Sequence, residues 1–139
     1  MKRNAERNKN LNSWAISEEL YEWIKNNLEH GKTILEFGSG KGTIELTKHW
    51  TVYSVEQDLK WIGLAPDSNY IHAPLKAKWY DTDIVFSNIP KKYDLILVDG
   101  PKGAKYRAGI DEHWDKFNTN VPLLFDDTQL SPPCGRNDY

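Results

Sequence analysis

The sequence predicts an α/β protein, built as a three-layer α/β/α sandwich around a mostly parallel sheet of about five strands. Short apolar runs alternate with amphipathic stretches, and a glycine-rich turn joins the first apolar run to the stretch that follows it. An apolar run without polar alternation is typical of a strand that is buried on both faces, as in a parallel sheet. The 139 residues suit a single domain that spans residues 1–139.

Composition restricts the function classes. The formal net charge is −2, so the chain lacks the overall basic character that is typical of nucleic-acid-binding domains. No apolar run has the length of a membrane span, and the polar start MKRNAERNKN is unlike a signal peptide. The single cysteine, Cys134, allows no internal disulfide. We therefore expect a cytoplasmic protein without membrane contact, with residues 1–12 as a flexible arm and 129–139 as a tail.

The first regular element is predicted after the arm. Ser17 is typical of a helix N-cap, because its hydroxyl can accept hydrogen bonds from N–H groups of the first turn. Glu18 and Glu19 then occupy the first turn, where the helix dipole favours acids. Apolar residues follow at helical spacing, and Gly31 is predicted to end the helix because glycine suits a left-handed cap.

The segment 33–48, TILEFGSGKGTIELTK, predicts a strand, a glycine-rich turn and a helix that begins near Thr43. Three glycines follow Glu36 at alternate positions: Gly38, Gly40 and Gly42. Glycines allow the backbone to approach a ligand closely, and a helix N-terminus adds free N–H groups. An ordinary tight turn needs one glycine. Three glycines that follow an acidic residue favour a binding site for a nucleotide or a similar cofactor.

A second strand is predicted within the segment 51–58, TVYSVEQD, and it ends at Glu56. In mononucleotide-binding folds, an acid at this position accepts hydrogen bonds from ribose hydroxyls. Glu56 is therefore the expected ribose ligand, with Gln57 as a neighbouring candidate. The alternative is a strand-end acid that meets only solvent.

Two more strands are predicted, over 70–75 and 93–100, with a connector helix that runs toward Phe86 between them. The segment 93–100, YDLILVDG, should be the central strand because its apolar residues are continuous. It ends at Asp99. Ligands in open α/β sheets bind beyond the carboxyl ends of the strands, so Asp99 is the expected catalytic acid at that end.

The segment 102–109, KGAKYRAG, forms a basic loop after this strand. Two interpretations stay open. The charges are a solvated run, or they steer an anionic acceptor such as a uronate or a phosphorylated sugar.

A short helix over 111–117 and a fifth strand over 121–127 complete the prediction. The fifth strand ends in Asp126 and Asp127. Adjacent carboxylates at a strand end repel each other unless a cation lies between them. Together with Asp99 they predict an oxygen site that suits Mg²⁺ or another divalent cation.

The order acid-x-Gly-x-Gly-x-Gly resembles motif I of the class I S-adenosylmethionine-dependent methyltransferases. The matching positions are Glu36, Gly38, Ser39, Gly40 and Gly42. In that family the turn holds the methionine part of the cofactor, which carries no phosphate. The resemblance extends over roughly Trp14 to Thr128 and implies a Rossmann-like fold and S-adenosylmethionine as the cofactor.

The strand ends extend the resemblance. Metal-dependent O-methyltransferases of the catechol type carry an acid after the fourth strand, a lysine three residues beyond it, and an acidic pair or Asp-Asn after the fifth strand. Asp99, Lys102, Asp126 and Asp127 stand at these positions, with Asp127 in place of the asparagine. The sequence DGP after the fourth strand is similar to the sugar- and polysaccharide-directed members. The resemblance implies O-methylation of a small molecule or sugar, with Asp99 and Lys102 as catalytic residues.

The chain departs from the family at its end. It stops before the helix and antiparallel hairpin that complete a class I sheet, so the predicted fold is truncated at the C-terminus. The exposed edge of the fifth strand is then a pairing surface, and we expect self-association through it.

Three alternatives stay open. The first is a module that binds S-adenosylmethionine without turnover. The second is a nucleic-acid methyltransferase, which is disfavoured because amino-group methyltransferases carry an Asn/Asp-Pro-Pro-aromatic turn where this chain has Asp99-Gly-Pro-Lys. The third is an NAD-binding protein, whose GxGxxG pattern is absent.

Overall fold

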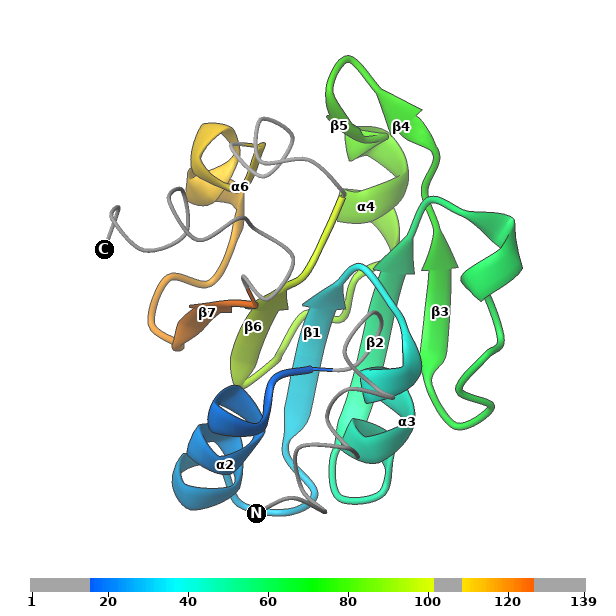
Figure 1. Cartoon of the computed structure of the whole chain (residues 1–139). Helices are drawn as coiled ribbons and strands as arrows, with labels where there is room; N and C mark the ends of the chain where they lie inside the picture. The colour runs from blue at the N-terminus through cyan, green and yellow to red at the C-terminus, as the bar shows by residue number, and fades with distance from the viewer. Residues whose placement is uncertain (1–15, 102–108, 127–139) are drawn as a thin grey trace, which may run out of the picture.

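The computed structural model describes residues 16–101 and 109–126. Its main sheet has five parallel strands in the order β3-β2-β1-β6-β7 (Figure 1). These strands are β1 (Thr33–Phe37), β2 (Thr51–Glu56), β3 (Asn69–His72), β6 (Leu95–Val98) and β7 (Leu123–Phe125). The order and direction of the strands confirm the predicted Rossmann-like α/β fold.

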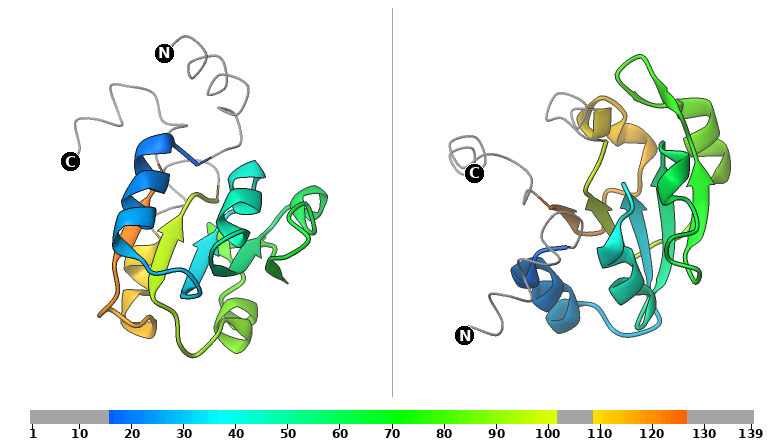
Figure 2. Two further views of the ribbon diagram at one scale, coloured as in Figure 1. Left: turned by 90° about the horizontal axis from the view of Figure 1, so that it is seen from below. Right: turned by 45° about the vertical axis from the view of Figure 1, so that its right-hand side comes forward.

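Helices cover both faces of this sheet. They are α2 (Glu18–Asn27), α3 (Lys41–Thr47), α4 (Thr82–Asn88) and α6 (Gly109–Glu112), with 3-10 turns η1 (Leu59–Trp61) and η2 (Trp114–Lys116). The view from below in Figure 2 shows α2 and α3 on one face and α4 and α6 on the other. The predicted three layers are therefore present.

Each face of the sheet carries its own apolar core, because successive side chains of a strand point to opposite faces. In β1, Ile34 packs with α2 and α3, whereas Leu35 and Phe37 pack on the side of α4 and α6. In β6, Leu97 packs with α2 and α3, and Ile96 packs on the side of α4 and α6. The central strands are thus buried on both faces, as their continuous apolar runs predict.

Helix α2 begins as predicted and ends earlier than predicted. The Ser17 hydroxyl accepts a hydrogen bond from the Leu20 N–H at 3.2 Å. The C-cap is Leu28, and Gly31 follows with φ +90°. The indole N–H of Trp50 donates to the carbonyl of Leu28 at 3.2 Å and to that of Glu29 at 3.0 Å. These bonds satisfy carbonyl groups beyond the helix end, so the helix stops there without exposing them.

Helix α3 begins at Lys41, two residues before the predicted start. Gly40 is its N-cap, and the Thr43 N–H donates to the Gly40 carbonyl at 3.1 Å. The Gly40 N–H in turn donates to the Thr43 hydroxyl at 3.1 Å. The last glycine of the turn, Gly42, therefore lies inside the first turn of the helix.

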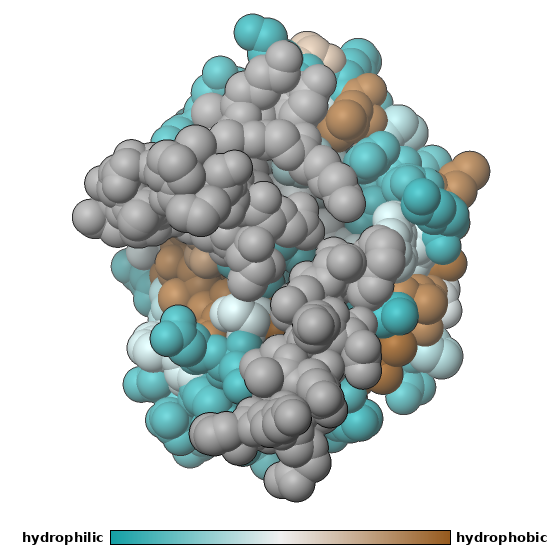
Figure 3. Space-filling model, in the orientation of Figure 1, coloured by the Kyte–Doolittle hydropathy of each residue, from teal (hydrophilic) through white to brown (hydrophobic). Residues whose placement is uncertain are grey.

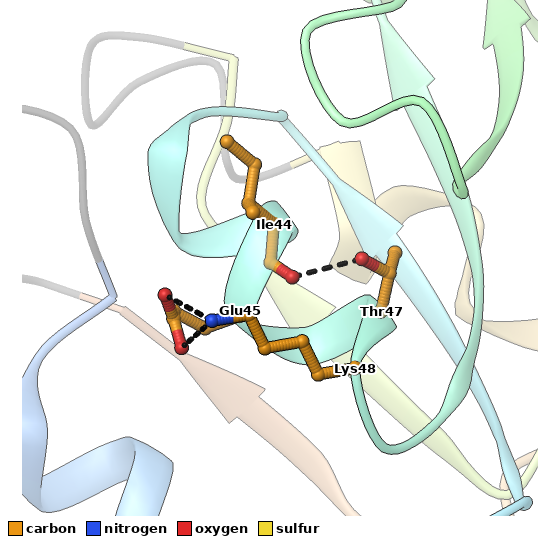
Figure 4. Close-up of polar contacts among 4 residues, drawn as sticks. All are labelled: Ile44, Glu45, Thr47 and Lys48. Carbon is orange, nitrogen blue, oxygen red and sulfur yellow. Dashed lines mark hydrogen bonds and ion pairs between the residues drawn. The ribbon is translucent and has the colours of Figure 1, made fainter.

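The outer face of α3 makes ordinary surface contacts, which Figure 4 shows. Lys48 Nζ lies 3.2 Å from each carboxylate oxygen of Glu45, and both side chains are well exposed. The Thr47 hydroxyl donates to the Ile44 carbonyl at 2.8 Å. An exposed ion pair of this kind contributes little to stability, so the inner face of α3 holds the helix in place.

A small antiparallel hairpin replaces the end of the predicted third strand. Strand β3 ends at His72, and β4 (Leu75–Lys76) then pairs with β5 (Trp79–Tyr80). Ala77 and Lys78 form its turn with φ +56° and +80°. Two-residue hairpin turns of this kind normally carry glycine or asparagine, and their absence here removed the sequence signal.

The remaining elements are shorter than predicted. The helix predicted over 111–117 is divided into α6 and η2. Strand β6 begins at Leu95, and strand β7 begins after Pro122, whose carbonyl accepts from the Ile96 N–H at 2.9 Å. Proline has no N–H group, so it cannot extend the ladder itself.

In the coloured part of Figure 3, hydrophilic residues are widespread, and hydrophobic areas lie at the position of β7 and on the right-hand side of the view. Phe125 of β7 and Leu75 of β4 are each 39% exposed. Within residues 16–101 and 109–126, no helix has the length and apolar character that crossing a bilayer requires.

Candidate functional site at the carboxyl end of the sheet

Four acidic residues stand at or just after the carboxyl ends of the parallel strands: Glu36, Glu56, Asp99 and Asp126. An apolar residue precedes each acid by an even number of positions in the same strand, and this residue packs with α2 and α3. In the order of the acids, these residues are Ile34, Val52, Leu97 and Leu124. Because side chains alternate along a strand, all four acids belong to the α3 side of the sheet. The four acids therefore stand at one end of the parallel sheet, and their gathering into one site stays a prediction.

The strand order reverses between β1 and β6, which makes this the topological switch point of the sheet. The backbones after the two strands touch there. A Cβ atom on Gly38, which has φ +92°, would lie 2.8 Å from both the Asp99 carbonyl carbon and the Gly100 nitrogen. Gly38 is thus required by packing against the neighbouring strand end. Close packing also requires glycine at position 42, since a Cβ atom added there would lie 2.5 Å from the Ile16 nitrogen.

The N–H groups of the glycine-rich loop are used inside the protein. The Gly38 N–H donates to the Val55 carbonyl at 2.8 Å, and the Ser39 N–H donates to Glu56 Oε1 at 2.7 Å. The Gly40 N–H donates to the Thr43 hydroxyl. A loop that binds phosphate presents such N–H groups to the ligand. The N–H groups of Gly38, Ser39 and Gly40 are therefore not directed to a ligand, because each already has an acceptor within the protein.

Glu36 lies beneath the loop and is 4% exposed. The Thr43 hydroxyl lies 2.9 Å from both of its carboxyl oxygens, and the Ser54 hydroxyl lies 2.7 Å from Oε1. Burial raises the pKa of Glu36 to about 8, although these two hydroxyl groups act to lower it. Repulsion from Glu56 and Asp126 adds to the rise in the pKa. Glu36 therefore supports the loop from below.

Glu56 is 5% exposed and connects the loop to the segment after β2. Its two carboxylate oxygens accept from the N–H groups of Ser39 at 2.7 Å and Asp58 at 2.9 Å. Burial raises the pKa of Glu56, and the backbone hydrogen bonds oppose that rise. Each carboxylate oxygen can accept a second hydrogen bond. The neighbouring candidate Gln57 offers its backbone carbonyl to His72 Nε2 at 3.2 Å.

Hydroxyl groups that the sequence analysis missed surround the loop. The Tyr70 hydroxyl lies 2.9 Å from the Ser39 hydroxyl and accepts from the Ala65 N–H at 3.1 Å. The Ser39 hydroxyl lies 3.2 Å from the Thr43 hydroxyl. One signal was visible in the sequence: Ser54 is a polar residue at a buried position of β2. The pairing of these groups depends on strand register, which the sequence does not state.

Tyr80 was also missed. It belongs to the hairpin strand β5, is 1% exposed, and reaches the switch point between β1 and β6. A Cβ atom on Gly100 would lie 2.7 Å from the Tyr80 hydroxyl oxygen. The phenol therefore lies beside the backbone that follows Asp99.

The predicted metal and base residues are only partly described. Lys102 and Asp127 lie outside the described residues, as do the arm 1–12, the tail 129–139 and most of the basic loop. Among residues 16–101 and 109–126, no group of three or more His, Cys, Asp or Glu side chains is arranged to hold a metal ion. The metal site on Asp99, Asp126 and Asp127 stays a prediction.

A surface groove of about 470 Å³ lies elsewhere. Its lining includes Phe86, Tyr93, Lys116 and Phe117. Tyr93 precedes β6, so this groove belongs to the amino ends of the strands and is separate from the acidic cluster.

No protein-family model matches the chain, and no curated protein matches it.

Proposed function

We propose that the chain is an S-adenosylmethionine-dependent methyltransferase that methylates an oxygen atom of a small molecule or sugar. The observation that carries this proposal is the glycine-rich loop at the switch point, whose N–H groups at residues 38–40 are used internally while Glu36 and Glu56 lie beside it. A binding site at the switch point is the general expectation for this fold.

The charge of this site favours a cofactor without phosphate. A dinucleotide would bring a pyrophosphate to a loop that has few free donors and is bordered by carboxylates. S-adenosylmethionine carries an ammonium and a sulfonium group and no phosphate, so acidic surroundings attract it. This comparison supports S-adenosylmethionine over NAD.

Glu56 is the proposed ribose ligand. It stands at the end of β2, one strand away from the switch point, and the Ser39 N–H fixes its orientation at 2.7 Å. Its remaining acceptor positions suit two neighbouring hydroxyl groups. Gly38, Ser39, Gly40 and Gly42 would border the methionine part of the cofactor, above the buried Glu36.

Asp99 is the proposed general base. Methyl transfer from a sulfonium needs alignment of the acceptor oxygen with the methyl carbon, and removal of the acceptor proton. Without a metal, Asp99 would take that proton; with a metal held by Asp99, Lys102 would take it. A Mg²⁺ ion on Asp99, Asp126 and Asp127 would lower the pKa of the acceptor hydroxyl. An anionic acceptor would suit the basic residues of the 102–109 segment.

The first experiment is calorimetry of the purified protein with S-adenosylhomocysteine, S-adenosylmethionine and NADH. We expect both adenosyl compounds to bind and NADH not to bind. Transfer of a labelled methyl group would then be measured with phenols, neutral sugars and uronates as acceptors. Binding without transfer to any of these supports the alternative of a binding module. Binding of NADH alone would overturn the proposal.

A further inference from the structure

A chain of hydrogen bonds runs beneath the glycine-rich loop, and its first arm leads from β3 to Glu36. The Tyr70 and Ser39 hydroxyls lie 2.9 Å apart, and the Ser39 and Thr43 hydroxyls lie 3.2 Å apart. The Thr43 hydroxyl then lies 2.9 Å from the Glu36 carboxyl. This arm joins β3, the loop, α3 and β1.

The second arm leads from Glu36 toward the segment before β3. Ser54 lies 2.7 Å from Glu36 Oε1, and the Ser54 and Ser68 hydroxyls lie 2.7 Å apart. The Ser68 hydroxyl donates to the Val52 carbonyl at 3.2 Å. The chain therefore ends at a backbone acceptor that has no proton to give.

The number of protons in this chain can be counted. The two arms have six links, if the contact of Thr43 with both oxygens of Glu36 is counted once. Five side-chain hydroxyls take part, namely those of Tyr70, Ser39, Thr43, Ser54 and Ser68. Each hydroxyl brings one proton. One link therefore lacks a proton when Glu36 is ionised.

We propose that Glu36 carries the sixth proton in the folded protein and donates it to Ser54. The direction follows from the end of the chain. Ser68 donates to Val52, so Ser54 must donate to Ser68 and must itself accept from Glu36. With this proton, all six links are complete and the buried Glu36 carboxyl carries no charge.

The surroundings of Glu36 agree with a neutral carboxyl. Burial, together with repulsion from the carboxylates of Glu56 and Asp126, raises the pKa of Glu36 to about 8, although the hydroxyl groups of Ser54 and Thr43 act to lower it. Asp99 follows the neighbouring strand β6, and the charged residues of α3, Lys41 and Glu45, are exposed at the surface. The described neighbours that affect this carboxyl are thus mainly acidic, which favours its protonated form.

The complete chain also fixes the role of Ser39. Thr43 gives its proton to Glu36, so Ser39 must give its proton to Thr43 and accept from Tyr70. Ser39 is a half-buried residue, and its hydroxyl oxygen keeps one lone pair for a ligand. It can therefore accept from a ligand ammonium or hydroxyl group but cannot donate to a phosphate. This consequence rests on the proposed function, whereas the proton on Glu36 does not.

The test uses Glu36→Gln in the full chain. A glutamine amide imitates the protonated carboxyl, because its oxygen can accept from Thr43 and its NH₂ can donate to Ser54. We expect the variant to fold, and thermal unfolding checks this. The wild type should take up about one more proton on folding than the variant, at pH values between the ordinary glutamate pKa and the raised one. Glu45→Gln on the exposed face of α3 is the matched control and should keep the wild-type proton uptake.

Infrared spectroscopy of the wild type supplies a second readout that needs no variant to fold. A protonated carboxyl has a carbonyl band that an ionised one lacks, and we expect this band at neutral pH. Glu36→Gln should remove the band, and Glu56→Gln should leave it. Absence of the band from the wild type, or an unchanged proton uptake in Glu36→Gln, would overturn the inference. If S-adenosylhomocysteine binds to none of the proteins, the proposed function fails, and the proton measurements still decide the state of Glu36.

Discussion

Glu56 holds two backbone N–H groups with a single carboxylate, and the proposed ribose contact would use the same group. Its removal would therefore affect the loop and the segment after β2 together. In the proposed site, the side chain would act both as a direct acceptor from the ribose and as a support for Ser39. Substitutions at this position have to separate these two effects.

We expect Glu56→Ala to weaken binding of S-adenosylhomocysteine by at least about tenfold, because a buried acceptor of several hydrogen bonds is lost. Calorimetry measures the affinity, and thermal unfolding shows whether the fold is kept. Asp67→Asn is the control, since Asp67 is an exposed acid in the same segment between β2 and β3. An affinity that stays at the wild-type value would remove the ribose assignment.

The metal prediction has its own test. We expect the double variant Asp126→Ala, Asp127→Ala to lose any stimulation of methyl transfer by Mg²⁺, because it removes two of the oxygen ligands proposed for the cation. Methyl transfer is measured with added Mg²⁺ and with a chelator. Full activity of the wild type in chelator would argue against a metal in the reaction.

The strand-end acids could be predicted from the sequence because apolar runs stop visibly at Glu56 and Asp99. The hydroxyl groups around the loop could not. Ser54 lies beside Glu36 only through the register of β1 and β2, and Tyr70 meets Ser39 only because β3 pairs with β2. Such contacts join residues that are distant in sequence, and no local pattern records them.

At the scale of elements, the glycine-rich turn fits against the end of β6 through bare backbone. Gly38 and Gly31 have nearly the same φ, +92° and +90°, and they differ in their surroundings. Gly38 faces the backbone of Asp99 and Gly100, whereas a Cβ atom on Gly31 would meet nothing within 4 Å. Substitutions at the two positions therefore distinguish the cost of backbone strain, which both share, from the cost of close packing, which only Gly38 has.

We expect Gly31→Ala to reduce the free energy of unfolding by about 1–2 kcal/mol, which is the cost of a left-handed conformation for a residue with a Cβ atom. Gly38→Ala should cost at least about 2 kcal/mol more, because the added carbon also overlaps the neighbouring backbone. Urea denaturation measures both values. Equal losses in the two variants would show that the contact between the strand ends is not tight.

The hairpin of β4 and β5 could not be predicted from the sequence. Its turn residues, Ala77 and Lys78, carry no turn signal, yet both have positive φ. The hairpin is held by burial of Trp79 and Tyr80, which are 2% and 1% exposed. Tertiary packing therefore decides this element against local preference, and it also brings Tyr80 to the switch point.

At the scale of the whole molecule, the sheet has two edges, β3 and β7. Among the described residues, β7 pairs only with β6, and Phe125 at its end is 39% exposed. An exposed strand edge with apolar side chains is a surface for pairing with another chain. The expected self-association is thus assigned to this edge.

We expect the protein to sediment as a species larger than the monomer at high concentration, and Phe125→Lys to shift it toward the monomer, because a charge at a strand edge opposes pairing. Leu75→Lys is the matched control. Leu75 has the same exposed fraction of 39% but belongs to the separate hairpin sheet. A wild type that stays monomeric at every concentration would contradict the assignment.

The contact between Gly38 and Gly100 also restricts which amino acids can replace these glycines in evolution. A side chain on Gly38 would meet the main chain of Gly100, and a side chain on Gly100 would lie 3.0 Å from the Gly38 Cα atom. The obstacle to a side chain on Gly38 is main chain, and a side chain on Gly100 would also lie 2.7 Å from the Tyr80 hydroxyl oxygen, so an exchange at one position does not make room for an exchange at the other. We therefore expect relatives with this strand order to keep both glycines independently, without correlated replacement.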